Sequence, residues 1–288
     1  MRTPLRHNTI ATLVLLAHLP FLLSAQLRGD TYSKARQTKS AKFYYVYDGV
    51  PGFVDKDASG EVKGLLVDIM RGFESYVRAS KGISVSVEFV QVPDKDFKIF
   101  MSEVKNGSGG VFGLSNVSIK EERKKDYLFS PAYMNNVSVL ISNAKTPTLT
   151  NLDDLNTRFA GKKAYSVASS TYYDRLDDLR KNYYPSMEII SLPSVNEVMS
   201  MVTENNDAFA VIDLNYYLEA LKSKKSIKRH SVGDKGEDKF GVIMPLSNDW
   251  EPLIKEFFDG GFIGGTDYRL LITDNLGKGA LRLIEGTN

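Results

Sequence analysis

Arg123 could bind an anion, because it belongs to a segment expected to open a helix directly after a buried strand. In Gly113–Arg123 (GLSNVSIKEER), Ser118 and Glu121 have the Ser-x-x-Glu spacing of a capping box. A helix start of this kind presents free backbone N–H groups, and an arginine in its second turn can bind a carboxylate through two parallel hydrogen bonds. The alternative is a solvated surface, since residues 120–126 form a run of charges.

Asp213 could bind a cation, because it ends the apolar segment Ala208–Asp213 (AFAVID) and precedes an expected helix. Its carboxylate can accept hydrogen bonds from an ammonium group, but aspartate is also a favoured N-cap residue. Ser169, Ser170 and Thr171 form a hydroxyl-rich helix start that is open to the same two interpretations. These positions matter because ligands of open parallel sheets bind beyond the carboxyl ends of the strands.

Tyr47 and Phe53 flank the first expected loop, where an aromatic ring could pack on a ligand or could instead complete the core.

The composition excludes several kinds of catalytic or metal site. The 288 residues contain no cysteine, which removes disulfides, thiolate catalysis and cysteine zinc sites. With His7 and His18 near the N-terminus, His230 is the one histidine left for a folded domain, which argues against a catalytic triad or a histidine metal site. We expect no metal.

The glycines of 107–113 (GSGGVFG) run into a strand instead of a helix, so neither a P-loop nor a dinucleotide fingerprint is present and we expect no cofactor.

Hydrophobic residues make up 42% of the chain and charged residues 25%, which is ordinary for a soluble globular protein. The net charge is +2, and removal of Arg2 and Arg6 leaves 35 basic against 35 acidic residues. A neutral chain offers no global field for nucleic acid, so we expect no nucleic-acid partner.

The first 25 residues have the layout of a secretory signal: basic Arg2 and Arg6, an apolar run over 10–23, then small Ser24 and Ala25. We expect cleavage after Ala25 and a periplasmic protein. The alternative is an uncleaved anchor, but the apolar run is shorter than the roughly 20 residues that a spanning helix needs. The polar residues 26–41 lack periodicity and predict a flexible linker.

The remaining chain predicts two α/β units. Apolar periodicity and turn residues predict strand, helix, strand, helix and strand at 42–47, 65–77, 83–92, 96–105 and 111–114. A strand follows at 137–142, and then a similar order restarts at 163–167, 170–182, 187–191, 194–203, 208–213 and 214–221. This order is typical of parallel sheets with helical crossovers, and its repetition indicates two lobes. A last strand at 240–245 precedes helices at 250–258 and 268–276.

Five segments in this order resemble extracytoplasmic solute-binding proteins, family 3, which deliver amino acids to ABC transporters. Pro51–Ile69 is similar to the family's opening pattern, and Gly113–Tyr133 to its most diagnostic segment, with a small polar pair, an arginine-ending turn and a Phe-Ser-x-x-Tyr tail. Three further segments resemble the start of the second lobe, its acidic strand end and the C-terminal return: Phe159–Leu176, Ala208–Asp213, and Phe240–Trp250 with Gly260–Gly277.

The resemblance implies an α/β, two-lobed type II periplasmic-binding-protein-like fold with two parallel-rich sheets and flanking helices. Two hinge strands near 137–142 and 239–245 would join a first lobe of 42–138 plus 242–288 to a second lobe of 139–241. The ligand would lie between the lobes. A small-molecule ligand, most simply an amino acid, and the membrane permease of an ABC transporter are the implied partners of a monomer without catalytic activity.

The resemblance also implies roles for single residues. Arg123 would pair with the ligand α-carboxylate, helped by Ser118 and the backbone near Asn116. Asp213 would hold the α-ammonium group. Ser170 and Thr171 would add contacts from the second lobe. Tyr47 or Phe53 would pack an aromatic face on the ligand side chain.

Two departures leave the ligand's identity open. Asn116 stands where the family often has serine or threonine, and Ser169, Ser170 and Thr171 stand where it often has Gly-Thr-Thr. Two other functions fit the same fold. One is a dehydratase acting on prephenate-like acids, which would need an aspartate or glutamate as its general acid. The other is a sensory protein whose closure is read by a partner.

Overall fold

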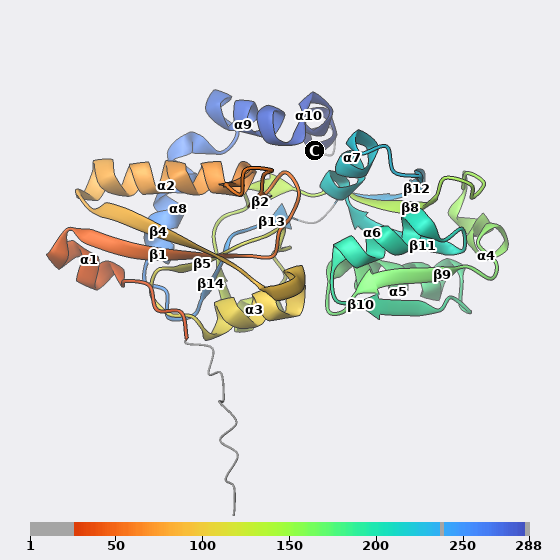
Figure 1. The fold of residues 1–288 in the computed structure, drawn as a ribbon, viewed down its shortest axis with the longest axis horizontal. Coiled ribbons are helices and arrows are strands. Elements are labelled where there is room, and N and C mark those ends of the chain that lie inside the picture. Colours follow the sequence, from red (N-terminus) through yellow and green to blue (C-terminus); the bar gives the residue numbers. More distant parts are fainter. Residues whose placement is uncertain (1–25, 237–238, 286–288) are drawn as a thin grey trace, which may run out of the picture.

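The computed structural model describes residues 26–236 and 239–285, which form two lobes side by side (Figure 1). Lobe 1 is built on a five-stranded sheet in the order β4-β1-β5-β14-β6. The strands are β4 (Ser84–Gln91), β1 (Ser40–Tyr47), β5 (Val111–Leu114), β14 (Ile243–Pro245) and β6 (Tyr127–Phe129). β4, β1 and β5 are parallel, whereas β14 runs antiparallel to both of its neighbours.

Lobe 2 repeats this plan with a sheet in the order β10-β9-β11-β8-β12. Its strands are β10 (Ile189–Leu192), β9 (Lys163–Val167), β11 (Ala208–Asp213), β8 (Ser138–Asn143) and β12 (Ile227–Lys235). β10, β9 and β11 are parallel, and β8 is antiparallel to β11 and β12. The expected two-lobed α/β fold is therefore confirmed, with mixed sheets.

Helices cover both faces of each sheet, as the two apolar faces of buried strands require. In lobe 1, α2 (Leu65–Lys81) and α8 (Glu251–Phe257) cover one face and α3 (Phe97–Asn106) covers the other. In lobe 2, α6 (Val195–Glu204) and α7 (Leu214–Lys222) lie on one face, with α4 (Leu155–Arg158) and α5 (Thr171–Tyr183) on the other. Strand β11 illustrates the alternation, since Ala208, Ala210 and Ile212 pack toward α6 while Phe209 and Val211 pack toward α5.

Two short strands carry the chain between the lobes. β7 (Met134–Asn135) pairs antiparallel with β13 (Lys239–Phe240), and the chain crosses from β7 into β8 and later returns to β13. The expected crossing near 137–142 is therefore displaced to β7, whereas the one expected near 239–245 contains β13. All six residues of β8 are buried, so this strand belongs to the sheet of lobe 2 and not to a connection.

Residues 26–41 are ordered in the structure, so the expected flexible linker is wrong. Helix α1 (Tyr32–Thr38) begins at its N-cap Thr31 and precedes β1 directly. The carboxylate of Asp249 accepts hydrogen bonds from the backbone nitrogens of Tyr32, 2.7 Å, and Ser33, 3.1 Å. The indole nitrogen of Trp250 donates to the carbonyl of Asp30 at 2.8 Å. This polar segment is ordered because residues of lobe 1 form hydrogen bonds with its backbone groups. The amino-acid composition of the segment does not reveal such partners.

The helix expected from the capping box at Ser118 does not form. Ser118 forms an antiparallel bridge with Phe240, and the nitrogen of Ile119 donates to the carbonyl of Lys239 at 2.8 Å. Only a single 3-10 turn, Arg123–Lys125, follows. Pairing with the return strand therefore outcompetes a local helix signal.

The C-terminal helices α9 (Thr266–Leu276) and α10 (Lys278–Glu285) lie over α2 and extend toward α7 of lobe 2 (Figure 1). The second of these was not expected from the sequence. Ala280 and Ile284 of α10 line a small cavity together with Leu214 and Leu218 of α7. Within residues 26–236 and 239–285, no helix combines the length and apolarity that crossing a membrane requires. The expected signal segment, residues 1–25, lies outside the described residues.

Candidate ligand-binding site

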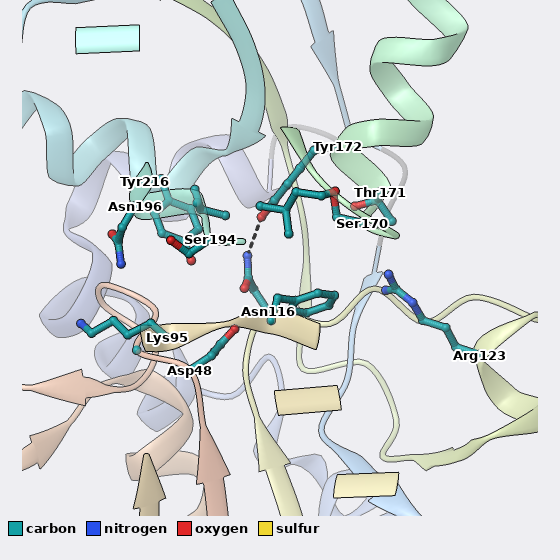
Figure 2. A pocket seen from close by; sticks show the side chains of 14 residues that line it. Asp48, Lys95, Asn116, Arg123, Ser170, Thr171, Tyr172, Ser194, Asn196 and Tyr216 are labelled. Atoms are coloured by element: carbon teal, nitrogen blue, oxygen red, sulfur yellow. Dashed lines mark hydrogen bonds between the residues drawn. The ribbon is translucent and has the colours of Figure 1, made fainter. Parts of the chain in front are cut away.

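A pocket lies between the lobes, and Figure 2 shows the polar side chains that converge on it. Lobe 1 contributes Asp48, Gly49, Lys95, Phe97, Asn116 and Arg123, and lobe 2 contributes Val167, Ser170, Thr171, Tyr172, Ser194, Val195, Asn196 and Tyr216. The lining follows the carboxyl ends of β1, β5 and β9 and the starts of α5 and α6, where parallel sheets bind their ligands.

Asp48 is the one carboxylate among the described residues that line this pocket. It comes directly after β1 and is only 7% exposed, and its Oδ1 atom has no hydrogen-bond partner among the described residues. Burial raises the pKa of Asp48 to about 7, against the opposing effects of a hydrogen bond with the Ser115 side chain and, to a smaller extent, of the nearby Lys95. A buried carboxylate with an unsatisfied oxygen is costly unless a donor is supplied to it, so Asp48 is suited to accept a hydrogen bond or a positive charge from a ligand.

Lys95 lies at the edge of the pocket, where its ammonium group pairs with Asp55 at 2.7 Å. Its side chain runs over Gly49, whose φ of +76° favours glycine. A Cβ atom at Gly49 would lie 2.7 Å from the Cδ and Cε atoms of Lys95. The glycine therefore both makes the turn after Asp48 and leaves room for the lysine.

Arg123 reaches the pocket from the 3-10 turn that replaces the expected helix. Nη1 of Arg123 donates to the carbonyl of Ser118 at 3.1 Å, and Nη2 donates to the carbonyl of Ser169 in lobe 2 at 3.2 Å. The guanidinium carbon lies 5.9 Å from the ring centre of Phe97. Arg123 thus places a fixed positive charge at the junction of the lobes.

Two helices of lobe 2 begin at the pocket. Ser170 caps α5 by accepting a hydrogen bond from the nitrogen of Tyr173, and its hydroxyl donates to the carbonyl of Val167 at 2.6 Å. Ser194 caps α6 by accepting one from the nitrogen of Glu197 at 3.3 Å. These helix starts and Arg123 together give the pocket a region that favours an anion.

Asp213 lies beside the pocket in a hydrogen-bond network and is only 1% exposed. The hydroxyl of Tyr172 donates to its Oδ2 atom at 2.5 Å, and the side-chain amide of Asn116 donates to the same atom. The amide of Asn136 donates to the other carboxylate oxygen, Oδ1. The Asp213 side chain does not cap α7, so its hydrogen bonds serve this network and not the helix start.

The structure brings four of the expected site residues into the pocket lining: Arg123, Asn116, Ser170 and Thr171. Asp213 lies behind Asn116 and Tyr172 and does not itself line the pocket.

Ser118, Tyr47 and Phe53 are buried and lie outside the pocket lining. Phe53 packs in the core, with its ring centre 6.1 Å from those of Tyr133 and Phe240. For Tyr47 and Phe53 the structure thus favours the core interpretation that the sequence left open.

Sequence reasoning missed Asp48, Lys95, Tyr172 and Ser194. Asp48 and Ser194 follow expected strands, so the rule that selected Asp213 applies to them as well. Asp48 lies in the first expected loop, between Tyr47 and Phe53, where a polar residue is typical of a turn. Lys95 and Tyr172 give no comparable signal, since they reach the pocket only through tertiary packing.

The family model for bacterial extracellular solute-binding proteins, family 3, matches residues 45–232, which is more than half of the chain. The protein therefore belongs to this family of extracytoplasmic binding proteins. No curated protein matches the sequence. Among the described residues, no group of three histidine, aspartate or glutamate side chains could hold a metal ion.

Solved structures of binding proteins share the fold at low sequence identity. An ABC uptake transporter substrate-binding protein from Streptococcus pneumoniae with bound histidine has a TM-score of 0.66 and 20% identity, covering 87% of this chain and 98% of that one. An ancestral arginine-binding protein bound to arginine has a TM-score of 0.65 and 18% identity, with coverage of 83% and 99%. The ancestral amino-acid-binding protein AncCDT-1, a precursor of cyclohexadienyl dehydratase, has a TM-score of 0.64 and 17% identity, with coverage of 85% and 98%.

Proposed function

We propose that this solute-binding protein captures a small amino-acid-like solute, with a carboxylate and a cationic group, for uptake by the permease of an ABC transporter. The observation that carries the proposal is the separation of charge in the pocket. Arg123 and the starts of α5 and α6 favour a carboxylate, while the unpartnered oxygen of Asp48 favours a donor. The amino acids bound by structurally similar proteins belong to the same chemical class.

Capture follows from the division of these groups between the lobes. Asp48 and Arg123 belong to lobe 1, whereas Ser170, Thr171 and Ser194 belong to lobe 2. A solute that contacts both sets stabilises the closed arrangement over the open one, because closure is favoured only by contacts that the open state lacks. The paired strands β7 and β13 are the natural hinge for this motion.

A thermal-shift screen of the standard amino acids and small carboxylates tests the proposal, because a solute that binds only the folded state raises the melting temperature. We expect Arg123→Ala to weaken binding of the best solute at least about tenfold in calorimetry, since it removes a charge-assisted partner. Arg78→Ala is the control, because Arg78 is exposed on α2 away from the pocket. A screen without any stabilising solute, or unchanged affinity in Arg123→Ala, would contradict the proposal.

Export and the absence of catalysis belong to the same proposal. We propose that residues 1–25 direct export and are removed, and that the mature monomer works in the periplasm. Mass spectrometry of protein from the periplasmic fraction would give the N-terminal residue, with Gln26 expected. Incubation with prephenate tests the dehydratase alternative, for which Asp48 is the carboxyl group that faces the pocket. We expect no aromatic product to form, and its appearance would make the protein an enzyme.

A further inference from the structure

Two cationic side chains lie at opposite ends of the pocket. In Figure 2, Arg123 lies at one end, beside the start of α5, and Lys95 lies at the other. Asn196, at the start of α6, lies over the Lys95 end. Each end therefore joins a cation from lobe 1 to polar groups from lobe 2. Such an end suits a carboxylate, because hydrogen bonds between ionised partners are the strong ones.

Lys95 is held at its end of the pocket by its backbone and by Asp55. Asp94 and Lys95 have φ values of +54° and +53°, so the chain makes a left-handed turn that directs the lysine across Gly49. Nζ of Lys95 pairs with Asp55 at 2.7 Å, and Asp55 is not among the described residues that line the pocket. An ammonium group donates three hydrogen bonds, so the bond to Asp55 leaves donors for a solute.

Asp48 lies between the two cationic ends in Figure 2. It is only 7% exposed, and its Oδ1 atom has no hydrogen-bond partner among the described residues. The order of charges along the pocket is thus cation, carboxylate, cation. A solute of complementary charge carries a carboxylate, an ammonium group and a second carboxylate in the same order.

We propose that the solute is an acidic amino acid, with its α-carboxylate at Arg123, its ammonium group at Asp48 and its side-chain carboxylate at Lys95. This inference rests on the proposed function, which it narrows from amino-acid-like solutes to dicarboxylic ones. Lys95 is then the residue that determines specificity. Its charge attracts a side-chain carboxylate and repels the cationic side chain of a basic amino acid, so it selects by both attraction and repulsion.

The test compares acidic amino acids with their own amides by calorimetry. Glutamate and glutamine, like aspartate and asparagine, have nearly the same shape and differ in charge. We expect the acid of one pair to bind at least about tenfold more tightly than its amide, because only the acid forms a charge-assisted bond with Lys95. Glutarate and succinate lack the ammonium group, so they should bind at least about tenfold more weakly than that acid.

Lys95→Met removes the ammonium group and keeps a long side chain, so it should reduce the preference for the acid to within about threefold. Lys95→Met combined with Asp55→Asn should do the same, which excludes the Asp55 carboxylate, left without its partner, as the cause. Lys63→Met is the matched control. Lys63 also pairs with an aspartate of this hairpin, Asp57 at 2.7 Å, but lies outside the pocket lining, so the preference of the parent should remain. Melting curves check that each variant folds, and Lys95→Gln replaces a methionine variant that does not.

Equal affinity of the parent for acid and amide, or a preference that survives removal of the Lys95 charge, would overturn the inference. Glutarate or succinate binding as tightly as the acid would overturn the placement of the ammonium group at Asp48. A failure of the proposed function has a different signature, because no amino acid or small carboxylate would then raise the melting temperature, and the inference would fall with it.

Discussion

Asp48→Asn is the substitution from which the structure predicts the most specific result, because the carboxyl group is buried and its Oδ1 atom has no hydrogen-bond partner among the described residues. The pKa of Asp48 is raised by burial from 3.8 to about 7. Between these two values the folded protein keeps a proton that the unfolded chain has released. The free energy of unfolding therefore rises as the pH falls from above 7 toward 4, as far as this group contributes.

The magnitude follows from the difference between the two pKa values. Each pKa unit corresponds to about 1.4 kcal/mol, so ionised Asp48 destabilises the folded state by up to about 4 kcal/mol above pH 7. Asparagine has nearly the same shape and carries no charge at any pH. Asp48→Asn should therefore stabilise the protein by about this amount near pH 8.5 and by only about 1 kcal/mol near pH 4.5.

Urea denaturation of both proteins at these two pH values is the assay, since its midpoint and slope give the free energy of unfolding. Asp55→Asn serves as the control. It removes a partly exposed carboxylate from the same corner of the site, so it should change the free energy of unfolding by less than about 1 kcal/mol at either pH. If the difference between Asp48→Asn and the parent does not depend on pH, the assignment of a buried carboxyl group with a raised pKa is refuted.

Two further predictions concern groups outside the charged pocket contacts. Burial lowers the pKa of His230 to about 4, so protonation of this side chain destabilises the folded state. As the pH falls from 6.5 to 4, the parent should lose about 3 kcal/mol of unfolding free energy relative to His230→Gln. Urea denaturation measures this difference, and a difference that stays constant with pH would contradict the prediction. Gly49→Ala should lower the melting temperature and weaken solute binding, because alanine disfavours the φ of +76° and its Cβ atom would meet the Lys95 side chain. Gly60→Ala is the control, since Gly60 has a similar φ but a Cβ atom there would have no atom within 4 Å. This second variant should change the melting temperature only.

Periodicity predicted most of the elements because it reports burial directly. The apolar residues of 65–77 recur at helical spacing, and all of them are buried in α2. Local signals failed where a distant segment offered a better partner. The capping box at Ser118 yields to pairing with Phe240, and the polar segment of α1 is held by Asp249 and Trp250. Such partners lie more than a hundred residues away, so no local pattern contains them.

The site was predictable to the extent that strand ends position it. The rule for parallel sheets points to the ends of β1, β5, β9 and β11, and each of these ends lies at or beside the pocket. The rule does not say which of two aspartates at such ends faces the pocket. Asp48 and Asp213 follow strands of similar character, but only Asp213 meets donors from both Asn116 and Asn136.

The contrast between these two aspartates explains how a binding pocket can carry an unpaired acid without losing its fold. Asp213 accepts hydrogen bonds from Asn116, Asn136 and Tyr172, so the cost of burying it at 1% exposure is offset within the protein. Asp48 has an oxygen without a protein partner, so its burial costs free energy that a donor from the solute removes. Binding energy is thus concentrated at Asp48, the group that the protein leaves unsatisfied, and not at Asp213, whose oxygens already have donors from the protein.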